Sequence, residues 1–281
     1  MKKINVLYLL GAGRSGTTLL ASLLNSHPEI LFKGELNQLQ DYIFINDKCS
    51  CGKNLSDCLE WSSIYSKLIG KISIETINQK NKIESHRNIP SYLLHSKSHK
   101  EYLDFQNEIF STLYKGKESL ILLDSSKYIS RYLQIYKSNF LDVKGIYLVR
   151  DIRGVINSFN KNVQTSKKPF QSIVYYLLIN TFGEITYRLN KKNILKIRYE
   201  DLVLQTNETL TDIYNFIGIS YQESFKIDVE IPHIVGGNRL KSQKKIKVNP
   251  DFEWKRNLKK RFKIIYYLLS FPFMILNKYK L

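Results

Sequence analysis

A glycine-rich segment between a strand-like run and a helical run constrains the fold of this 281-residue chain more than any other feature. The sequence GAGRSGTT at positions 11–18 follows the apolar run Val6–Leu10 and leads into an apolar helical pattern that begins at Thr17. Its three glycines allow a tight turn that points N–H groups inward, and the N-terminus of the following helix favours negative charge. The segment therefore predicts a strand, a loop and a helix that together bind a phosphate or a sulfate ester.

The loop departs from the phosphate loop of nucleoside triphosphatases at one position. Aligned with G-x-x-x-x-G-K-[ST], residues 11–18 keep both glycines and the final hydroxyl, but Thr17 replaces the lysine that reaches the β- and γ-phosphates. The loop instead carries Arg14, whose planar guanidinium suits a terminal sulfate or phosphate. This pattern argues against ordinary ATP or GTP hydrolysis, although a glycine turn kept only for packing is the alternative when the loop is considered alone.

A second segment combines a strand, an arginine and a helix. Gly145–Val149 is suited to a buried parallel strand, and Arg153–Asn160 can form the helix that follows it. Arg150 would then stand at the strand end and Ser158 two turns along the helix. An arginine paired with a phosphate fixes a nucleotide strongly, and a serine adds a neutral hydrogen bond. The alternative is that Arg150 and Asp151 cap the helix or pair with each other.

Taken together, the motifs resemble those of sulfotransferases that use 3′-phosphoadenosine 5′-phosphosulfate (PAPS). Residues 11–20 with Asn25–Ile30 look like the family's 5′-phosphosulfate loop, and Gly145–Ser158 resembles its 3′-phosphate segment. Later segments, Ile197–Leu202 and His233–Arg239, are similar to its C-terminal motifs. The resemblance implies that PAPS is the donor co-substrate and that it is bound by Gly11, Ala12, Gly13, Arg14, Ser15, Gly16, Thr17, Thr18, Arg150, Ser158 and Arg239.

Transfer to a hydroxyl requires a base near the loop. Glu35 stands in a His-Pro-Glu then Gly-Glu order that resembles sulfotransferases whose base is a glutamate. We therefore expect Glu35 to be the catalytic base, with a surface pair between Glu35 and Lys33 as the alternative. His27 is next to Pro28, and we expect it to be a turn or helix-end residue.

Charge that builds on the sulfuryl oxygens and the leaving phosphate requires cations already in place. Arg14 is one candidate. Lys127, at the end of the strand-like run that begins at Ile121, is the second, and pairing with Asp124 is its alternative. Because side chains can neutralise the donor, no metal is required.

The acceptor implied by the resemblance is a hydroxyl group on a sugar of a glycan or glycolipid, because the motifs look more like those of carbohydrate-type members than of small-phenol members. Three alternatives stay open on the sequence. They are sulfation of a tyrosyl peptide, a nucleotide kinase with a degenerate phosphate loop, and a basic binding module without turnover.

Strand-like runs alternate with helical patterns and predict an α/β three-layer sandwich with a central parallel sheet, similar to P-loop nucleoside triphosphatases. The expected strands are Ile4–Leu10, Leu120–Leu123, Val143–Val149 and Ile194–Ile197. We expect one domain over residues 1–281, with a mainly helical insertion at about residues 42–118. The insertion is expected to lie over the acceptor site, and a structural subdomain is nearly as good an interpretation.

Three cysteines, Cys49, Cys51 and Cys58, occur within ten residues. Three thiolates could bind zinc with a fourth ligand from elsewhere, but the spacing lacks the paired C-x-x-C motifs of a strong zinc signature. We therefore expect no metal site and reduced loop cysteines, with one disulfide only in an oxidising environment.

The net charge of +18 comes without a recognition helix, zinc finger or single-strand-binding signature, so nucleic acid is not an expected partner. The first strand-like run begins at Ile4, which leaves no room for a signal peptide and predicts a cytoplasmic enzyme. Near the other end, residues 252–281 are basic and apolar. The run Ile264–Leu276 is too short to span a bilayer, and either lies on an anionic membrane surface or docks on the core.

Overall fold

The structure is a computed structural model that describes residues 3–95, 98–114, 120–161, 168–220, 228–230, 232–237 and 245–281. The elements up to the third strand are β1 (Ile4–Leu10), α1 (Thr17–Leu24), β2 (Ile30–Phe32), η1 (Leu36–Gln38), α2 (Leu39–Phe44), η2 (Leu55–Asp57), α3 (Ser62–Leu68), η3 (Ile69–Lys71), α4 (Ile74–Glu84), η4 (His86–Asn88), α5 (Ile89–Leu94), α6 (Lys100–Tyr114) and β3 (Ile121–Lys127). The later elements are α7 (Ile129–Ile135), β4 (Leu141–Val149), α8 (Ile152–Phe159), α9 (Pro169–Leu189), β5 (Ile194–Arg198), α10 (Tyr199–Leu204), α11 (Thr206–Ile217), β6 (Asp228–Glu230), β7 (Lys245–Lys247), α12 (Trp254–Asn257), α13 (Lys260–Leu269) and α14 (Phe271–Leu276).

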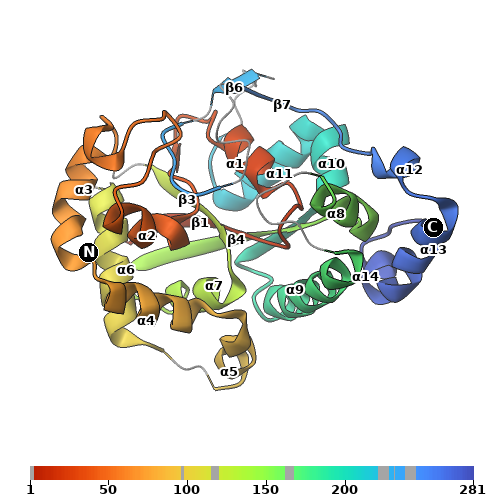
Figure 1. The fold of residues 1–281 in the computed structure, drawn as a ribbon, viewed down its shortest axis with the longest axis horizontal. Helices are drawn as coiled ribbons and strands as arrows, with labels where there is room; N and C mark the ends of the chain where they lie inside the picture. The colour runs from red at the N-terminus through yellow and green to blue at the C-terminus, as the bar shows by residue number, and fades with distance from the viewer. Residues whose placement is uncertain are drawn as a thin grey trace.

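A five-stranded parallel sheet in the order β2-β3-β1-β4-β5 forms the centre of the molecule (Figure 1). Side chains of β1 alternate between its two faces, as a strand requires. Val6, Tyr8 and Leu10 pack in a core with α6, α7 and α9, whereas Leu7 and Leu9 pack in a second core with α1, α10 and α11. Helices thus cover both faces, and the expected three-layer α/β sandwich is confirmed.

The strands differ from the sequence-based expectation at several places. Strand β4 begins at Leu141, two residues before the expected start, and β6 and β7 were not expected. The strand expected at Leu120–Leu123 runs on to Lys127, and the edge strand Ile30–Phe32 was not among the expected strands. Polar residues Asp124–Lys127 ended the apolar pattern, but they continue the strand because buried partners satisfy them. A three-residue edge strand is too short for its pattern to be recognised.

A buried charge network joins the insertion to the sheet. Arg131 of α7 is fully buried and pairs with Glu84 of α4 at 2.7 Å and with Asp124 of β3 at 3.1 Å. Gln106 of α6 accepts a third hydrogen bond from the Arg131 guanidinium. Burying one of these charges without its partners would cost several kcal/mol, so the network ties α4 and α6 firmly to α7 and β3.

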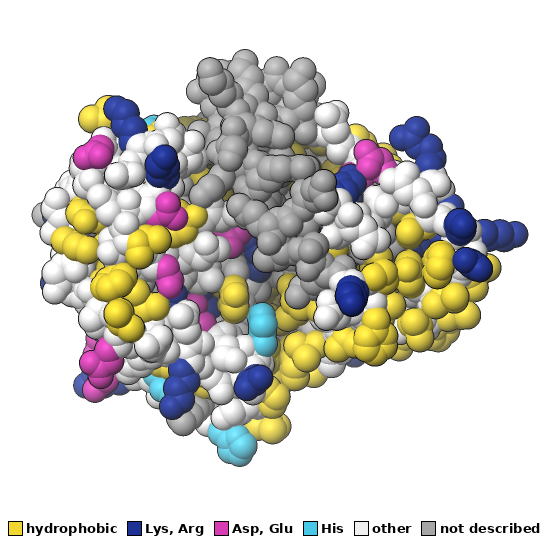
Figure 2. All heavy atoms as spheres, viewed as in Figure 1, with side chains coloured by type: hydrophobic (Ala, Val, Ile, Leu, Met, Phe, Trp, Pro, Cys, Tyr) yellow, Lys and Arg dark blue, Asp and Glu magenta, His cyan; other side chains and the backbone are white. Residues whose placement is uncertain are grey.

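The C-terminal helices dock on the core through one face and leave the other exposed. Tyr266, Tyr267, Met274 and Tyr279 are buried against α8 and α9. On the outer side, exposed apolar side chains gather over α9, α13 and α14, with lysines at their edge (Figure 2). Among the described residues, none of the helices is long and apolar enough to cross a membrane.

Candidate functional site

The loop at residues 11–18 lies between β1 and α1, as expected from the sequence. Gly16 has a left-handed φ of 98°, and a Cβ there would lie 2.5 Å from the ring of Tyr199, so only glycine fits. Ser15 is buried, and among the described residues its hydroxyl has no hydrogen-bond partner. A buried polar atom of this kind fits an anion oxygen.

Three of the predicted residues meet beside this loop, and we call Arg14, Arg150 and Ser158 the loop cluster. Arg14 Nε donates to Ser158 Oγ at 3.0 Å, and Arg150 Nη1 donates to the backbone carbonyl of Arg14 at 3.0 Å. Ser158 lies in the second turn of α8, and Arg150 follows the end of β4. Strand β4 and helix α8 therefore bring both residues to the loop, although each is at least 136 positions from Arg14 in the sequence.

The guanidinium of Arg150 already has an anionic partner. Its Nη2 lies 3.2 Å from Asp251 Oδ2, and it stacks over the ring of Tyr199, with the guanidinium carbon 4.0 Å from the ring centre. Burial alone would raise the pKa of Asp251, but the charges of Arg150 and Lys161 outweigh it and hold the pKa below its usual value. The Asp251 carboxylate is therefore an anionic ligand of Arg150 in the free protein.

The sequence offered a different partner for Arg150. Asp151 does not pair with Arg150. It caps α8 by accepting from the backbone N–H of Arg153 at 2.8 Å, and it binds the Arg153 guanidinium at 2.6 Å. Asp151 thus caps the helix, as one alternative from the sequence expected, but it does not pair with Arg150.

Glu35 and Lys127 form the second group, the Glu35–Lys127 pair. The Glu35 side chain is nearly buried and is held between two donors. Lys127 Nζ pairs with its Oε1, and Gln38 Nε2 donates to its Oε2 at 2.8 Å. The alternative partners are engaged elsewhere, because Lys33 pairs with Glu60 at 2.8 Å and Asp124 pairs with Arg131.

An irregular strand end aims Lys127 at Glu35. Strand β1 pairs with β3 at Tyr8↔Asp124 and then at Leu10↔Lys127, so β3 contains one extra residue. Such a bulge re-aims the side chains beyond it. Lys127 has a left-handed φ of 71° and Arg14 one of 70°. Both candidate cations thus hold a backbone conformation that costs energy, which is a frequent feature of functional sites.

The segment after Glu35 is fixed by the same strand end. Leu36 N–H donates to Asp124 Oδ1 at 3.3 Å, and Asn37 N–H donates to Ser126 Oγ at 2.9 Å. On the other side, Glu35 N–H donates to the carbonyl of Val235 at 3.0 Å. Glu35 is therefore positioned by backbone contacts from two segments far away in the sequence.

Tyr175 of α9, which sequence reasoning missed, contacts the loop at residues 11–18. Its hydroxyl accepts a hydrogen bond from Gly13 N–H at 2.9 Å. Burial, and to a smaller extent the nearby charge of Glu35, raises the pKa of Tyr175. Tyr199, also missed as a site residue, lies within a quoted motif, but the apolar pattern of α9 gave no signal that could single out Tyr175.

Two further residues named from the sequence, His27 and Arg239, remain to be placed. His27 Nδ1 accepts from Glu29 N–H at 3.2 Å, and its Nε2 lies 2.9 Å from the carbonyl of Ser220, so His27 is a turn residue as expected. Arg239 lies outside the described residues.

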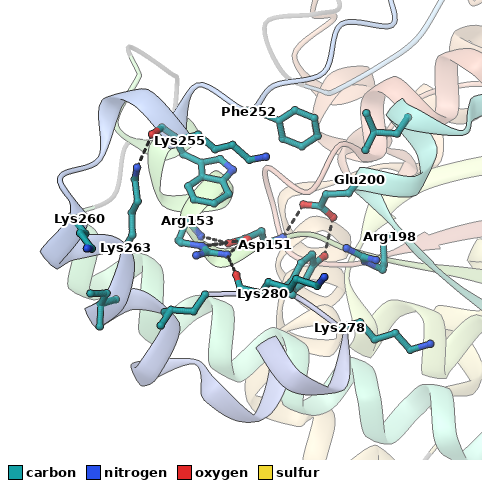
Figure 3. A pocket seen from close by; sticks show the side chains of 15 residues that line it. Asp151, Arg153, Arg198, Glu200, Phe252, Lys255, Lys260, Lys263, Lys278 and Lys280 are labelled. Carbon is teal, nitrogen blue, oxygen red and sulfur yellow. Dashed lines mark hydrogen bonds and ion pairs between the residues drawn. The ribbon is translucent and has the colours of Figure 1, made fainter.

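A cavity of about 880 Å³ lies between α8, α10 and the C-terminal helices (Figure 3). Seven of the fifteen residues that line it are lysines or arginines, and none of the predicted site residues is among the fifteen. Arg153 binds Asp151 and the carbonyl of Lys280, and Glu200 accepts from Tyr279. The cavity is therefore a separate basic pocket, closed on one side by the end of the chain.

The sequence profile of the sulfotransferase family matches residues 7–223. The chain belongs to the sulfotransferase family. This membership confirms the enzyme class expected from the motifs, and the match includes β1, the loop, β4 and α8. No curated protein sequence matches the chain.

Solved structures of sulfotransferases share the fold. The sulfotransferase domain of the curacin biosynthetic pathway is 16% identical with a TM-score of 0.63, and the match covers 100% of each chain. The sulfotransferase domain of the Synechococcus PCC 7002 olefin synthase is 20% identical with a TM-score of 0.59, covering 100% of this chain and 97% of that one. Mouse sulfotransferase SULT7A1, complexed with PAP, is 12% identical with a TM-score of 0.50, covering 94% and 82%.

Proposed function

We propose that this sulfotransferase transfers the sulfuryl group of PAPS to a sugar hydroxyl of a glycan or glycolipid, with Glu35 as the general base. The observation that carries the proposal is the meeting of Arg14, Arg150 and Ser158 at the loop, together with the Glu35–Lys127 pair. The mouse relative solved with PAP supports the choice of donor.

The residues present fit such a donor. The buried hydroxyl of Ser15, which has no partner within the described part of the chain, and the N–H groups of the loop suit a phosphosulfate, which supplies the sulfuryl group when it is bound. Arg150 and Ser158 would hold the 3′-phosphate. For this, Arg150 must exchange the Asp251 carboxylate for the phosphate, a stronger ligand because it carries more charge.

Glu35 and Lys127 would act at the acceptor. Glu35 takes the proton of the attacking hydroxyl as the new oxygen–sulfur bond forms and the bond from sulfur to the donor phosphate breaks. Lys127 and Arg14 balance the charge on the sulfuryl oxygens. In the free protein Lys127 binds Glu35, so a sulfuryl oxygen that draws Lys127 away would also free the Glu35 carboxylate to accept the hydroxyl proton.

We place the acceptor on the side of the insertion. Lys80 of α4 donates to the carbonyl of Asn37 at 2.6 Å and pairs with Asp41, so α4 packs against the turn that follows Glu35. We therefore propose that the acceptor hydroxyl approaches Glu35 past this part of the molecule.

The donor is tested by thermal unfolding. Adenosine 3′,5′-bisphosphate should raise the Tm far more than AMP, ADP or ATP do, because only the bisphosphate offers a 3′-phosphate to Arg150. Equal stabilisation by ATP would reject PAPS and favour a nucleotide kinase.

The acceptor class is found by incubating the protein with radiolabelled PAPS and an extract of glycans, lipids and peptides. Label in peptides alone would reject the sugar acceptor.

A glycolipid acceptor would place the enzyme at a membrane surface, and the C-terminal helices suit one. Leu268, Phe271 and Ile275 are each more than half exposed and belong to α13 and α14. The basic pocket lined by Lys260 and Lys263 lies beside them. Apolar side chains flanked by lysines bind anionic lipid surfaces.

Vesicle sedimentation tests this contact. Phe271→Glu should weaken binding to phosphatidylserine vesicles, whereas Leu94→Glu, an exposed leucine on α5, should not. Both variants should keep bisphosphate binding. Removing residues 264–281 is a poor test, because Tyr266, Tyr267 and Tyr279 are part of the core. Equal vesicle binding by both variants would reject the contact.

A further inference from the structure

A cluster of metal-binding side chains lies outside the candidate site. Three thiol sulfurs and one imidazole nitrogen all lie within 4.8 Å of one another, and they come from Cys49, Cys51, Cys58 and His233. From the sequence we expected no metal site, because the cysteine spacing lacks paired C-x-x-C motifs. The structure places His233, at least 175 residues away, against the three cysteines. We call these four residues the Cys₃His cluster.

We propose that the Cys₃His cluster binds one structural Zn²⁺ ion. Cysteine and histidine in these numbers are a common ligand set of closed structural zinc sites. Two of the sulfurs, those of Cys49 and Cys58, are buried, so solvent does not compete strongly for the ion.

The spacing of the ligand atoms agrees with a tetrahedral ion. Zn–S bonds of about 2.3 Å and Zn–N bonds of about 2.0 Å hold two sulfurs about 3.8 Å apart and a sulfur and nitrogen about 3.5 Å apart. The sulfurs of Cys51 and Cys58 are 3.8 Å apart. His233 Nδ1 lies 3.7 Å from the Cys49 sulfur and 3.1 Å from the Cys58 sulfur. A disulfide, with sulfurs about 2.0 Å apart, would need a movement of Cys51 or Cys58.

The ion would join two segments that flank Glu35. The cysteines lie between α2 and α3, and His233 belongs to the segment 232–237, which we call the strap. The strap continues to Val235, which exchanges backbone hydrogen bonds with Lys33 and Glu35 at 3.1 and 3.0 Å. Ser50 and Trp61 also bind the strap, at the carbonyls of Pro232 and His233. The zinc ion would thus fix the strap against which Glu35 is positioned.

Metal content tests the proposal without reference to activity. The full chain, purified under reducing conditions without chelators, should contain about one zinc ion per chain by elemental analysis and native mass spectrometry. Replacement by Co²⁺ should give the strong visible bands of a tetrahedral site and thiolate-to-metal charge-transfer absorption. Zinc below about a tenth of an ion per chain, with no such absorption, would overturn it.

Matched variants assign the ligands. Cys49→Ser and His233→Ala should lower zinc retention and alter the Co²⁺ spectrum, whereas His95→Ala, an exposed histidine outside the cluster, should change neither. If a cysteine variant does not fold, the wild-type Co²⁺ spectrum still decides. A Cys51–Cys58 disulfide found by mass mapping of alkylated protein in the reduced preparation, or an unchanged spectrum in His233→Ala, would reject the Cys₃His site.

Discussion

The loop cluster and the Glu35–Lys127 pair are assembled in different ways. The loop cluster consists of Arg14 in the loop and of Arg150 and Ser158, which follow one strand, β4, and each of the three belongs to a contiguous motif. The Glu35–Lys127 pair depends on a bulged strand end, on Asp124 within a buried charge network, and on the strap that contains His233 and Val235. The residues of the first group come from two short motifs that meet at the ends of adjacent strands, and their proposed role is to bind an anion. The second is positioned by long-range contacts, so it can be disturbed without loss of anion binding.

The largest effect should come from Glu35→Gln. Glutamine keeps the size of the side chain and its hydrogen bond with Gln38 or Lys127, but it cannot accept the proton of the attacking hydroxyl. Turnover should fall by roughly 10²- to 10⁴-fold, while the affinity for adenosine 3′,5′-bisphosphate changes only a few-fold. Steady-state kinetics and calorimetry on the same preparation measure both.

Glu29→Gln is the control, because Glu29 is an exposed carboxylate close in the sequence. Near-normal turnover in Glu35→Gln would reject its role as the base. A parallel loss of donor binding would show that Glu35 supports the loop instead, and the two groups would then not be separable.

Arg150→Ala should act mainly on the affinity for adenosine 3′,5′-bisphosphate, the quantity that Glu35→Gln should leave nearly unchanged. The variant should lose roughly 2 to 4 kcal/mol of bisphosphate binding if the pair with the phosphate is well desolvated, and with it the preference over ATP. Arg87→Ala, an exposed arginine in the insertion, is the control and should bind normally. Retained preference for the bisphosphate would show that Arg150 does not bind the 3′-phosphate.

Gly16, beside the loop cluster, and Gly34, beside Glu35, allow the two groups to be compared with the same substitution. A Cβ at Gly16 would meet the Tyr199 ring at 2.5 Å, and a Cβ at Gly34, where φ is 101°, would meet the carbonyl oxygen of Val235 at 2.0 Å. Each alanine variant should cost about 1 to 3 kcal/mol through strain and displacement. Gly16→Ala should weaken bisphosphate binding, and Gly34→Ala should lower turnover about ten-fold or more at nearly normal affinity.

Gly70→Ala is the neutral control, because nothing lies within 4 Å of a Cβ at Gly70. Thermal unfolding of all three variants separates a general loss of stability from the local effects. Equal loss of binding in Gly16→Ala and Gly34→Ala would contradict the separation of the two groups.

The same difference explains what could be predicted from the sequence. The loop, Arg150 and Ser158 lie in short motifs whose residues meet because adjacent parallel strands end at one edge of the sheet. Tyr175 comes from a helix whose pattern describes only burial. His233 begins a recognised motif, but that motif does not indicate the three cysteines, so both positions depend on packing between distant segments. The bulge at Lys127 was also not predictable, because the polar residues that form it ended the strand pattern.

The smallest effect, and one of opposite sign, should come from Asp251→Asn. Asp251 forms an ion pair with Arg150 in the free protein, so the proposed binding of a 3′-phosphate at Arg150 would displace Asp251. Asparagine is a weaker partner for Arg150, and the affinity for the bisphosphate should rise about three- to ten-fold, the equivalent of about 1 kcal/mol. Calorimetry at neutral pH measures the change.

The pH dependence of the free energy of unfolding is a second measure of the contact between Asp251 and Arg150. The pKa of Asp251 is held below its usual value, because Arg150 and Lys161 outweigh the effect of burial. The unfolded chain therefore binds this proton more readily, and the stabilisation by Asp251 is present above the unfolded pKa of about 3.9 and is lost as the pH falls through the lower folded pKa. Wild type and Asp251→Asn should differ in Tm at neutral pH and converge below this range.

A bisphosphate affinity that falls in Asp251→Asn would show that Asp251 positions Arg150 for the phosphate and does not compete with it.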